Sequence, residues 1–121
     1  MSSSYRIQAA TGIHRGDREY QQDQVLLMAH PYAKGCILGV VADGMGGRSG
    51  GRKASDQVML TARQVFERFE PAKEDCTRML RTIVQDAHTV IRLTAIAAEQ
   101  EPHSTIAVFV VLPDSRCHFM H

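Results

Sequence analysis

A short apolar segment that ends in an acidic, glycine-rich sequence is the feature that most constrains how this chain can fold. Residues 35–42 (GCILGVVA) are almost continuously apolar, a pattern typical of a strand buried on both sides. Residues 43–47 (DGMGG) follow directly, and such a run of glycines predicts an irregular loop. Beyond the loop, apolar residues recur at helical spacing. A buried strand, a loop and a helix are therefore expected in this order.

Apolar periodicity predicts the remaining elements. Further strands are expected at residues 6–13, 25–29, 105–112 and 117–121. Two helices are expected over residues 54–69 and 74–98, with Pro71 between them. Residues 113–115 (PDS) predict a hairpin turn. These elements indicate an α+β domain in which an antiparallel helical hairpin lies on a sheet.

Length and composition exclude several classes of protein. The 121 residues suffice for one domain with one core. A formal net charge of +1, without a long run of like charges, argues against a nucleic-acid surface. The longest apolar run has seven residues (106–112), far fewer than a membrane span requires, and the first residues do not resemble a signal peptide. We therefore expect a cytoplasmic protein that binds neither membranes nor nucleic acids.

The cysteines and histidines show no metal-binding spacing. Cys36, Cys76 and Cys117 are far apart in apolar surroundings, so all three are expected to be small buried residues in a reducing compartment. The chain has no CxxC pair, which removes a zinc site of the finger type. The six histidines form no HExxH pattern, and His118 and His121 are expected on opposite faces of a strand. All six are predicted to be surface or partly buried residues without a metal role.

Asp43 and Gly44 are the strongest candidates for chemistry. Asp43 ends the apolar segment, and five glycines lie within residues 44–51. Glycine permits positive φ and lets a backbone carbonyl approach a ligand, while carboxylate and carbonyl oxygens suit Mg²⁺ or Mn²⁺ rather than zinc or copper. The simpler interpretation is a tight turn capped by Asp43, since Asp-Gly is a common turn dipeptide. The cluster of glycines favours a ligand site.

A phosphate-binding loop for a nucleotide is the rival interpretation, because glycines before a helix also bind nucleotides. The dinucleotide fingerprint lacks its third glycine, since Ser49 stands at that position. Arg52 and Lys53 replace the Lys and Ser or Thr of a P-loop, so the hydroxyl that would bind magnesium is absent. Nucleotide binding therefore ranks second.

A polar segment, residues 18–23 (REYQQD), precedes the strand expected at residues 25–29. Taken alone, it is most simply a solvated turn. Its Arg18 could hold a phosphate group, because a guanidinium matches phosphate oxygens bidentately. Its Asp23 could be a second carboxylate near a metal.

Taken together, these segments resemble the protein phosphatase 2C family. Residues 18–23 are similar to the family's Arg-x-x-x-Glu-Asp motif, and residues 43–47 are similar to its Asp-Gly-His/Met-Gly-Gly motif in the Met form of the bacterial branch. Residues 54–55 (AS) in the next helix agree as well, and residues 103–105 (HST) resemble the family's Gly-Thr/Ser-Thr segment. The order and spacing agree over nearly the whole chain.

The resemblance implies a four-layer α-β-β-α sandwich and hydrolysis of phosphoserine or phosphothreonine by a metal-activated water. By the family's pattern, Asp43 would bridge two Mn²⁺ or Mg²⁺ ions and the Gly44 carbonyl would coordinate one of them. Asp23 would support the water shell, and Arg18 would hold the substrate phosphate. Two metals lower the pKa of a shared water, so no protein nucleophile is needed. The implied partners are a phosphorylated protein substrate and a cognate serine/threonine kinase in bacterial signalling.

Three departures from the family's pattern bear on activity. Gln22 stands where the family often has Glu, which removes a charge that would reach a metal through water. Met45 stands where other relatives have His, so the leaving group must take its proton from another donor or from water. The family's domain is about twice this length, and its other metal-binding aspartates lie in the second half. Residues 114–116 (DSR) imitate a later family segment, but Pro113 and the hairpin context identify them as a turn.

Residues 1–121 are therefore expected to be the N-terminal half of the domain. Alone, this half is expected to be inactive and to be either insoluble or self-associated through its exposed apolar sheet. The alternative is a non-catalytic half-domain or pseudophosphatase that only binds phosphoproteins or another partner.

Overall fold

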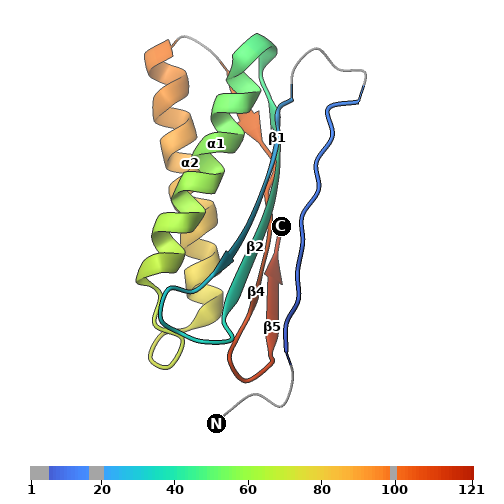
Figure 1. The fold of residues 1–121 in the computed structure, drawn as a ribbon. Helices are drawn as coiled ribbons and strands as arrows, with labels where there is room; N and C mark the ends of the chain where they lie inside the picture. The colour runs from blue at the N-terminus through green and yellow to red at the C-terminus, as the bar shows by residue number, and fades with distance from the viewer. Residues whose placement is uncertain (1–5, 17–20, 99–100) are drawn as a thin grey trace.

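Residues 6–16, 21–98 and 101–121, which the computed structural model describes, form five strands and two helices. The strands are β1 (Asp23–Ala29), β2 (Ile37–Met45), β3 (His103–Ser104), β4 (Ala107–Val111) and β5 (Cys117–Met120). The helices are α1 (Gly47–Arg68) and α2 (Cys76–Ala98). Both helices lie on the same side of the sheet (Figure 1). The expected α+β class, with a helical hairpin on an antiparallel sheet, is confirmed.

Strand β2 is the centre of the sheet. The strand order is β1-β2-β4-β5, every pairing is antiparallel, and the short β3 pairs with the far end of β2. One sheet with one helical layer corresponds to two of the four layers of the expected sandwich.

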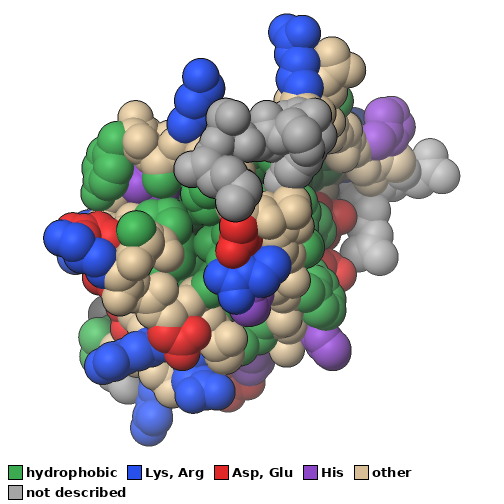
Figure 2. Space-filling model, turned by 90° about the horizontal axis from the view of Figure 1, so that it is seen from below, with side chains coloured by type: hydrophobic (Ala, Val, Ile, Leu, Met, Phe, Trp, Pro, Cys, Tyr) green, Lys and Arg blue, Asp and Glu red, His purple; other side chains and the backbone are tan. Residues whose placement is uncertain are grey.

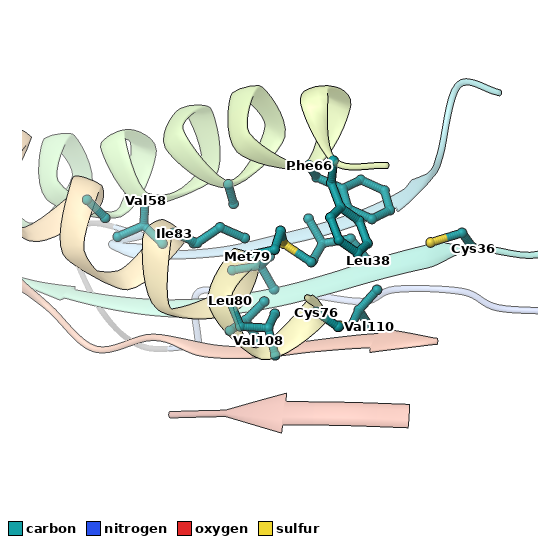
Figure 3. Close-up of a cluster of buried hydrophobic side chains, with 14 of the residues drawn as sticks. Cys36, Leu38, Val58, Phe66, Cys76, Met79, Leu80, Ile83, Val108 and Val110 are labelled. Atoms are coloured by element: carbon teal, nitrogen blue, oxygen red, sulfur yellow. The ribbon is translucent and has the colours of Figure 1, made fainter. Parts of the chain in front are cut away.

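The core lies between β2, β4 and the two helices. Alternate residues of β2 point toward the helices, and Leu38, Val40 and Ala42 are buried there. Val108 and Val110 of β4 are buried on the same face. Figure 3 shows these strands facing the apolar sides of α1 and α2, whose labelled residues include Val58, Phe66, Met79, Leu80 and Ile83. Each fully buried side chain of this size contributes about 2 kcal/mol, so the helical pair and the sheet stabilise each other.

The other face of the sheet is open, so the prediction that residues 35–42 are buried on both sides is wrong. Val41 is 56% exposed and Phe119 is 63% exposed. The ring of Phe109 lies over Gly39 of the neighbouring strand. The helices cover only one face (Figure 1), so outward residues such as Val41, Phe109 and Phe119 are exposed on the other. Self-association through this face stays a prediction.

Two sequence expectations about regular structure are also wrong. Residues 6–13 form no strand: within residues 6–16 the chain is extended and almost entirely exposed, and it contributes no strand to the sheet. Residues 43–47 are not an irregular loop, because β2 continues to Met45 and α1 begins at Gly47. Pairing with β1 and β3 keeps this segment extended, and only Gly46, with a φ of 143°, breaks the regular structure.

The hairpin turn between β4 and β5 is confirmed. The Arg116 carbonyl accepts a hydrogen bond from the Leu112 N–H at 2.8 Å, and Ser115 adopts a φ of 73°. Asp114 receives the Arg116 backbone N–H at 3.1 Å, and this bond lowers the pKa of its carboxyl group. The turn lies next to the start of β2, at the opposite end of that strand from Asp43. Residues 114–116 are therefore a structural turn.

The surface carries charges of both signs. Figure 2 shows basic and acidic side chains interspersed on the face viewed from below. Within the described residues, neither helix is long and apolar enough to cross a membrane.

His30 is a buried structural residue, although the sequence predicts a surface or partly buried position. Its Nε2 is 2.7 Å from the Phe69 carbonyl, and its Nδ1 accepts the Ala33 N–H at 3.0 Å. These partners fix the neutral tautomer that carries a proton on Nε2. The ring packs edge-on against Phe66, with centroids 5.0 Å apart. His30 thereby ties the β1–β2 connection to the end of α1.

We expect His30→Ala to lower the free energy of unfolding by about 3 kcal/mol, because it leaves a buried carbonyl and a backbone N–H without partners and removes a packed ring. Urea denaturation measures the change. The control is Tyr32→Phe, which deletes only an exposed hydroxyl bond to the Glu67 carbonyl and should cost about 0.5 kcal/mol. A loss below about 1 kcal/mol in His30→Ala would contradict this role.

The three cysteines differ, against the expectation that all are buried. Cys36 and Cys76 are buried, but Cys117 is exposed because it points outward from β5, on the open face. Burial, and secondarily the nearby Cys76 thiol, raises the pKa of Cys36 to about 11. Burial, and then Asp75, raises the pKa of Cys76 to about 11. At pH 8, about one thiol in a thousand at these two positions is therefore ionised.

We predict that a disulfide reagent such as DTNB titrates a single thiol rapidly at pH 8 in the folded protein. Cys117→Ser should abolish this rapid phase, and Cys36→Ser should leave it intact. Rapid reaction of all three thiols would show that Cys36 and Cys76 are accessible.

Candidate metal centre

Asp23 and Asp43 lie directly opposite each other on neighbouring strands. Asp23 opens β1, and the β1–β2 register pairs it with Asp43. Directly opposed residues point to the same face, with Cβ atoms about 5 Å apart. Both side chains are exposed, and they share the open face with Val41, two residues from Asp43 on β2. The structure thus places two carboxylates side by side at one end of the open face.

The segment from β3 to Thr105 holds the backbone of Asp43. The Thr105 N–H donates to the Asp43 carbonyl at 2.9 Å, and the Asp43 N–H donates to the Thr105 hydroxyl oxygen at 3.1 Å. Ser104 pairs with Gly44 and His103 pairs with Met45. The strand expected over residues 105–112 is β4 and begins only at Ala107. Thr105 lies before it and bonds to the backbone of Asp43 at the end of β2.

Gly44 and Gly51 allow the first turn of α1 to touch the end of β2. A Cβ on Gly51 would lie 2.7 Å from the Gly44 carbonyl carbon and 2.7 Å from the Met45 nitrogen. A Cβ on Gly44 would overlap the Gly51 carbonyl group and lie 2.8 Å from the Gln22 carbonyl oxygen. Gly44 itself is extended and donates its N–H to Gln22 at 3.0 Å. Glycine is therefore needed at position 44 because it has no side chain, and not because it adopts a positive φ.

Helix α1 also fixes the start of β1. The Gln24 side-chain amide donates to Asp56 at 2.6 Å, and the Arg52 guanidinium donates to the same carboxylate oxygen at 3.1 Å. Arg52 further donates to the Gln21 carbonyl at 3.3 Å. These bonds attach the residues on either side of Asp23 to the helix and hold the strand in register.

The described residues supply only part of a metal site. Among them, no group of three or more His, Cys, Asp or Glu side chains could hold an ion. Asp23, Asp43 and Gly44 lie together, whereas Arg18 falls outside the described residues. Met45 is 48% exposed next to the pair, and its thioether has no proton to donate.

A family model described as Protein phosphatase 2C matches residues 12–121. The chain belongs to the protein phosphatase 2C family. No curated protein and no solved structure gives a significant match. This is a family of protein phosphatases that are generally metal-dependent. The matched range contains all four predicted site residues, Arg18, Asp23, Asp43 and Gly44.

Sequence reasoning misses the residues that position the carboxylates. The motif resemblance includes Thr105 but does not predict its two bonds to Asp43, since they join positions 62 residues apart. Arg52 and Asp56 are four residues apart on α1 and form an exposed ion pair at 3.1 Å. A sequence shows such an i,i+4 pair on a helix, but it does not show that Gln24 bonds to Asp56 or that Arg52 bonds to Gln21.

Gly44→Ala should destabilise the fold by about 3 kcal/mol, because the new methyl group meets backbone that cannot rotate away. Urea denaturation provides the measurement. Gly12→Ala is the matched control, since its Cβ would meet no atom within 4 Å, and it should be within about 0.5 kcal/mol of the parent. Equal stability of the two variants would contradict the contact between β2 and α1.

Proposed function

We propose that this chain contributes to a metal-dependent site that hydrolyses phosphoserine and phosphothreonine in proteins. Membership of the protein phosphatase 2C family supports phosphatase chemistry. The observation that carries the proposal is the register between Asp23 and Asp43, which brings two hard oxygen ligands together beside the Gly44 backbone.

The residues present fit a divalent cation. Like charges directly opposite each other destabilise an antiparallel pair, and a cation held between the two carboxylates would replace repulsion with attraction. Gly44 donates its N–H toward Gln22. The N–H and carbonyl of a strand residue face the same neighbouring strand. The Gly44 carbonyl therefore also points toward the β1 side, where Asp23 lies. Two carboxylates and one carbonyl suit Mg²⁺ or Mn²⁺.

Each residue has a distinct proposed role. Asp43 would bind both of two Mn²⁺ or Mg²⁺ ions, the Gly44 carbonyl would bind one, and Asp23 would orient the surrounding water. Arg18 would hold the phosphate of the substrate through paired hydrogen bonds. Bound ions would lower the pKa of a water, so that hydroxide would be available near neutral pH to attack phosphorus. The hydrogen bonds from Thr105 would keep Asp43 oriented for this purpose.

The proposed partners are a phosphorylated protein substrate and a serine/threonine kinase of opposite action, and the proposed setting is bacterial signalling in the cytoplasm. In a non-catalytic module, the same carboxylate pair would bind ions and the chain would only recognise a phosphoprotein. Turnover by the complete phosphatase domain distinguishes the two.

Asp43→Asn tests the site through the difference in melting temperature between variant and parent, measured once in excess Mn²⁺ and once in EDTA. With excess Mn²⁺ the parent chain should be stabilised and the variant should not, because a ligand that binds only the folded state raises its stability. In EDTA the variant should be as stable as the parent or slightly more stable, because the substitution removes a like-charge contact. Asp86→Asn, an exposed change on α2, should behave as the parent in both conditions.

Within a complete phosphatase domain, Asp43→Asn should lower turnover of p-nitrophenyl phosphate by several orders of magnitude at saturating Mn²⁺. Near-normal turnover would show that Asp43 is not a metal ligand. Turnover indistinguishable from background in the parent domain as well would favour the non-catalytic module.

A further inference from the structure

A pocket of about 490 Å³ lies between α2 and the segment that carries β3. Its wall on the helix includes Ala87 and Ile91, and its opposite wall is formed by residues 101–104 and Ile106. Ile91 also packs against the core, on the helix side of the sheet, whereas Asp23 and Asp43 lie on the open face. The volume is within the range of small-molecule sites. The pocket is thus separate from the candidate metal centre.

The lining combines an apolar floor with a polar rim. Val58 and Ala87 are buried at the floor. At the rim, His88 and Arg92 are four residues apart and lie on one face of α2. His103 and Ser104 line the opposite wall. Because His103 pairs directly with Met45, its side chain lies on the same face of the sheet as Met45. In the described part of the chain, Arg92 forms no ion pair.

Hydrogen-bond donors outnumber carboxylates at this rim. Among the described lining residues Glu101 is the single carboxylate, against the Arg92 guanidinium and the His88 imidazole; the Ser104 hydroxyl already donates to the Thr105 carbonyl at 2.8 Å. A guanidinium matches the oxygens of a carboxylate or phosphate group. The floor would bury a hydrocarbon or aromatic body. The complementary ligand is therefore a small organic anion with an apolar body.

We propose that this pocket is an effector site for such an amphipathic organic anion, coupled to the segment that carries Asp43 and Gly44. Binding does not depend on the proposed phosphatase function, but its regulatory consequence does. Arg92 pairs with the anionic group, and the apolar body lies against Ala87 and Ile91.

The coupling follows from a shared wall. Ser104 lines the pocket and pairs with Gly44, and His103 lines it and pairs with Met45. Pro102 also lines the pocket, and its Cα lies only 2.7 Å from the position of a Cβ on Gly46. A ligand that binds this arrangement stabilises it. By thermodynamic reciprocity, any metal that needs the same arrangement strengthens binding of the ligand.

Equilibrium dialysis of 1-naphthaleneacetate against the 121-residue chain tests binding. The neutral analogue 1-naphthaleneacetamide should bind about fivefold more weakly, since it lacks the charge that pairs with Arg92. Arg92→Glu should weaken binding of the acid at least fivefold, and Glu101→Gln should strengthen it about twofold. Arg81→Glu is the matched control on the same helix, outside the pocket, and should change affinity less than twofold. Equal affinity of Arg92→Glu and Arg81→Glu would overturn the proposal.

A second measurement separates this site from the metal centre. In the Asp43→Asn variant, 1-naphthaleneacetate should bind with unchanged affinity, and it should slow hydrogen exchange of the Thr105 amide, whose acceptor is the Asp43 carbonyl. This outcome supports the effector site even if Asp43 proves not to bind metal. Binding without any change in exchange at Thr105 or Gly44 would overturn the coupling. Failure of the probe to bind would overturn the site and leave the proposed function unaffected.

Discussion

The close contact between Gly44 and Gly51 is the constraint on which the rest of the candidate site depends. Two backbones can approach this closely only where neither position carries a side chain. The contact seats the first turn of α1 on the end of β2, and from there Arg52 and Asp56 reach the start of β1. This single contact therefore aligns α1, β1 and β2, and with them the two aspartates.

Side chains along β2 alternate between the core and the face that carries the candidate site. Residues that point toward the helices, such as Leu38 and Val40, form the core, whereas Asp43 points away from it. Because the strand continues past Ala42, this alternation extends into the acidic motif. An irregular loop would leave the direction of Asp43 undefined. The pairing of β3 with β2 thus helps to determine the direction of the Asp43 carboxylate and the face on which a ligand would bind.

Elements with local signals could be predicted from the sequence, and those that depend on distant contacts could not. Helical periodicity and the turn signal of residues 113–115 suffice for α2, for the β4–β5 hairpin and for α1 from Ala54 onward, but they do not predict that residues 47–53, which begin α1, are helical. The extension of β2 to Met45 requires pairing with His103, which no local pattern reveals. Likewise, residues 6–13 have strand-like alternation but no partner strand among the described residues. Burial of His30 depends on the Phe69 carbonyl, 39 residues away.

The candidate site shows the same division. The family motifs identify Asp23, Asp43 and Gly44, and the register places them together. The supporting bonds from Thr105 and Arg52 emerge only from tertiary structure, because the side chains involved come from separate elements. A motif thus indicates which atoms could bind a ligand, whereas the fold shows what holds them in place.

The ring of Phe109 over Gly39 has a consequence for how this sheet can vary. The ring occupies the volume that a side chain on Gly39 would need, so the two positions share the space of one large residue. A larger residue at position 39 requires the Phe109 ring to move aside or a smaller residue to replace it, so the two positions are coupled. Such an exchange would conserve the total volume but move the aromatic surface from β4 to β2. The contour presented to any layer that packs on the open face would then shift by one strand spacing, about 4.8 Å.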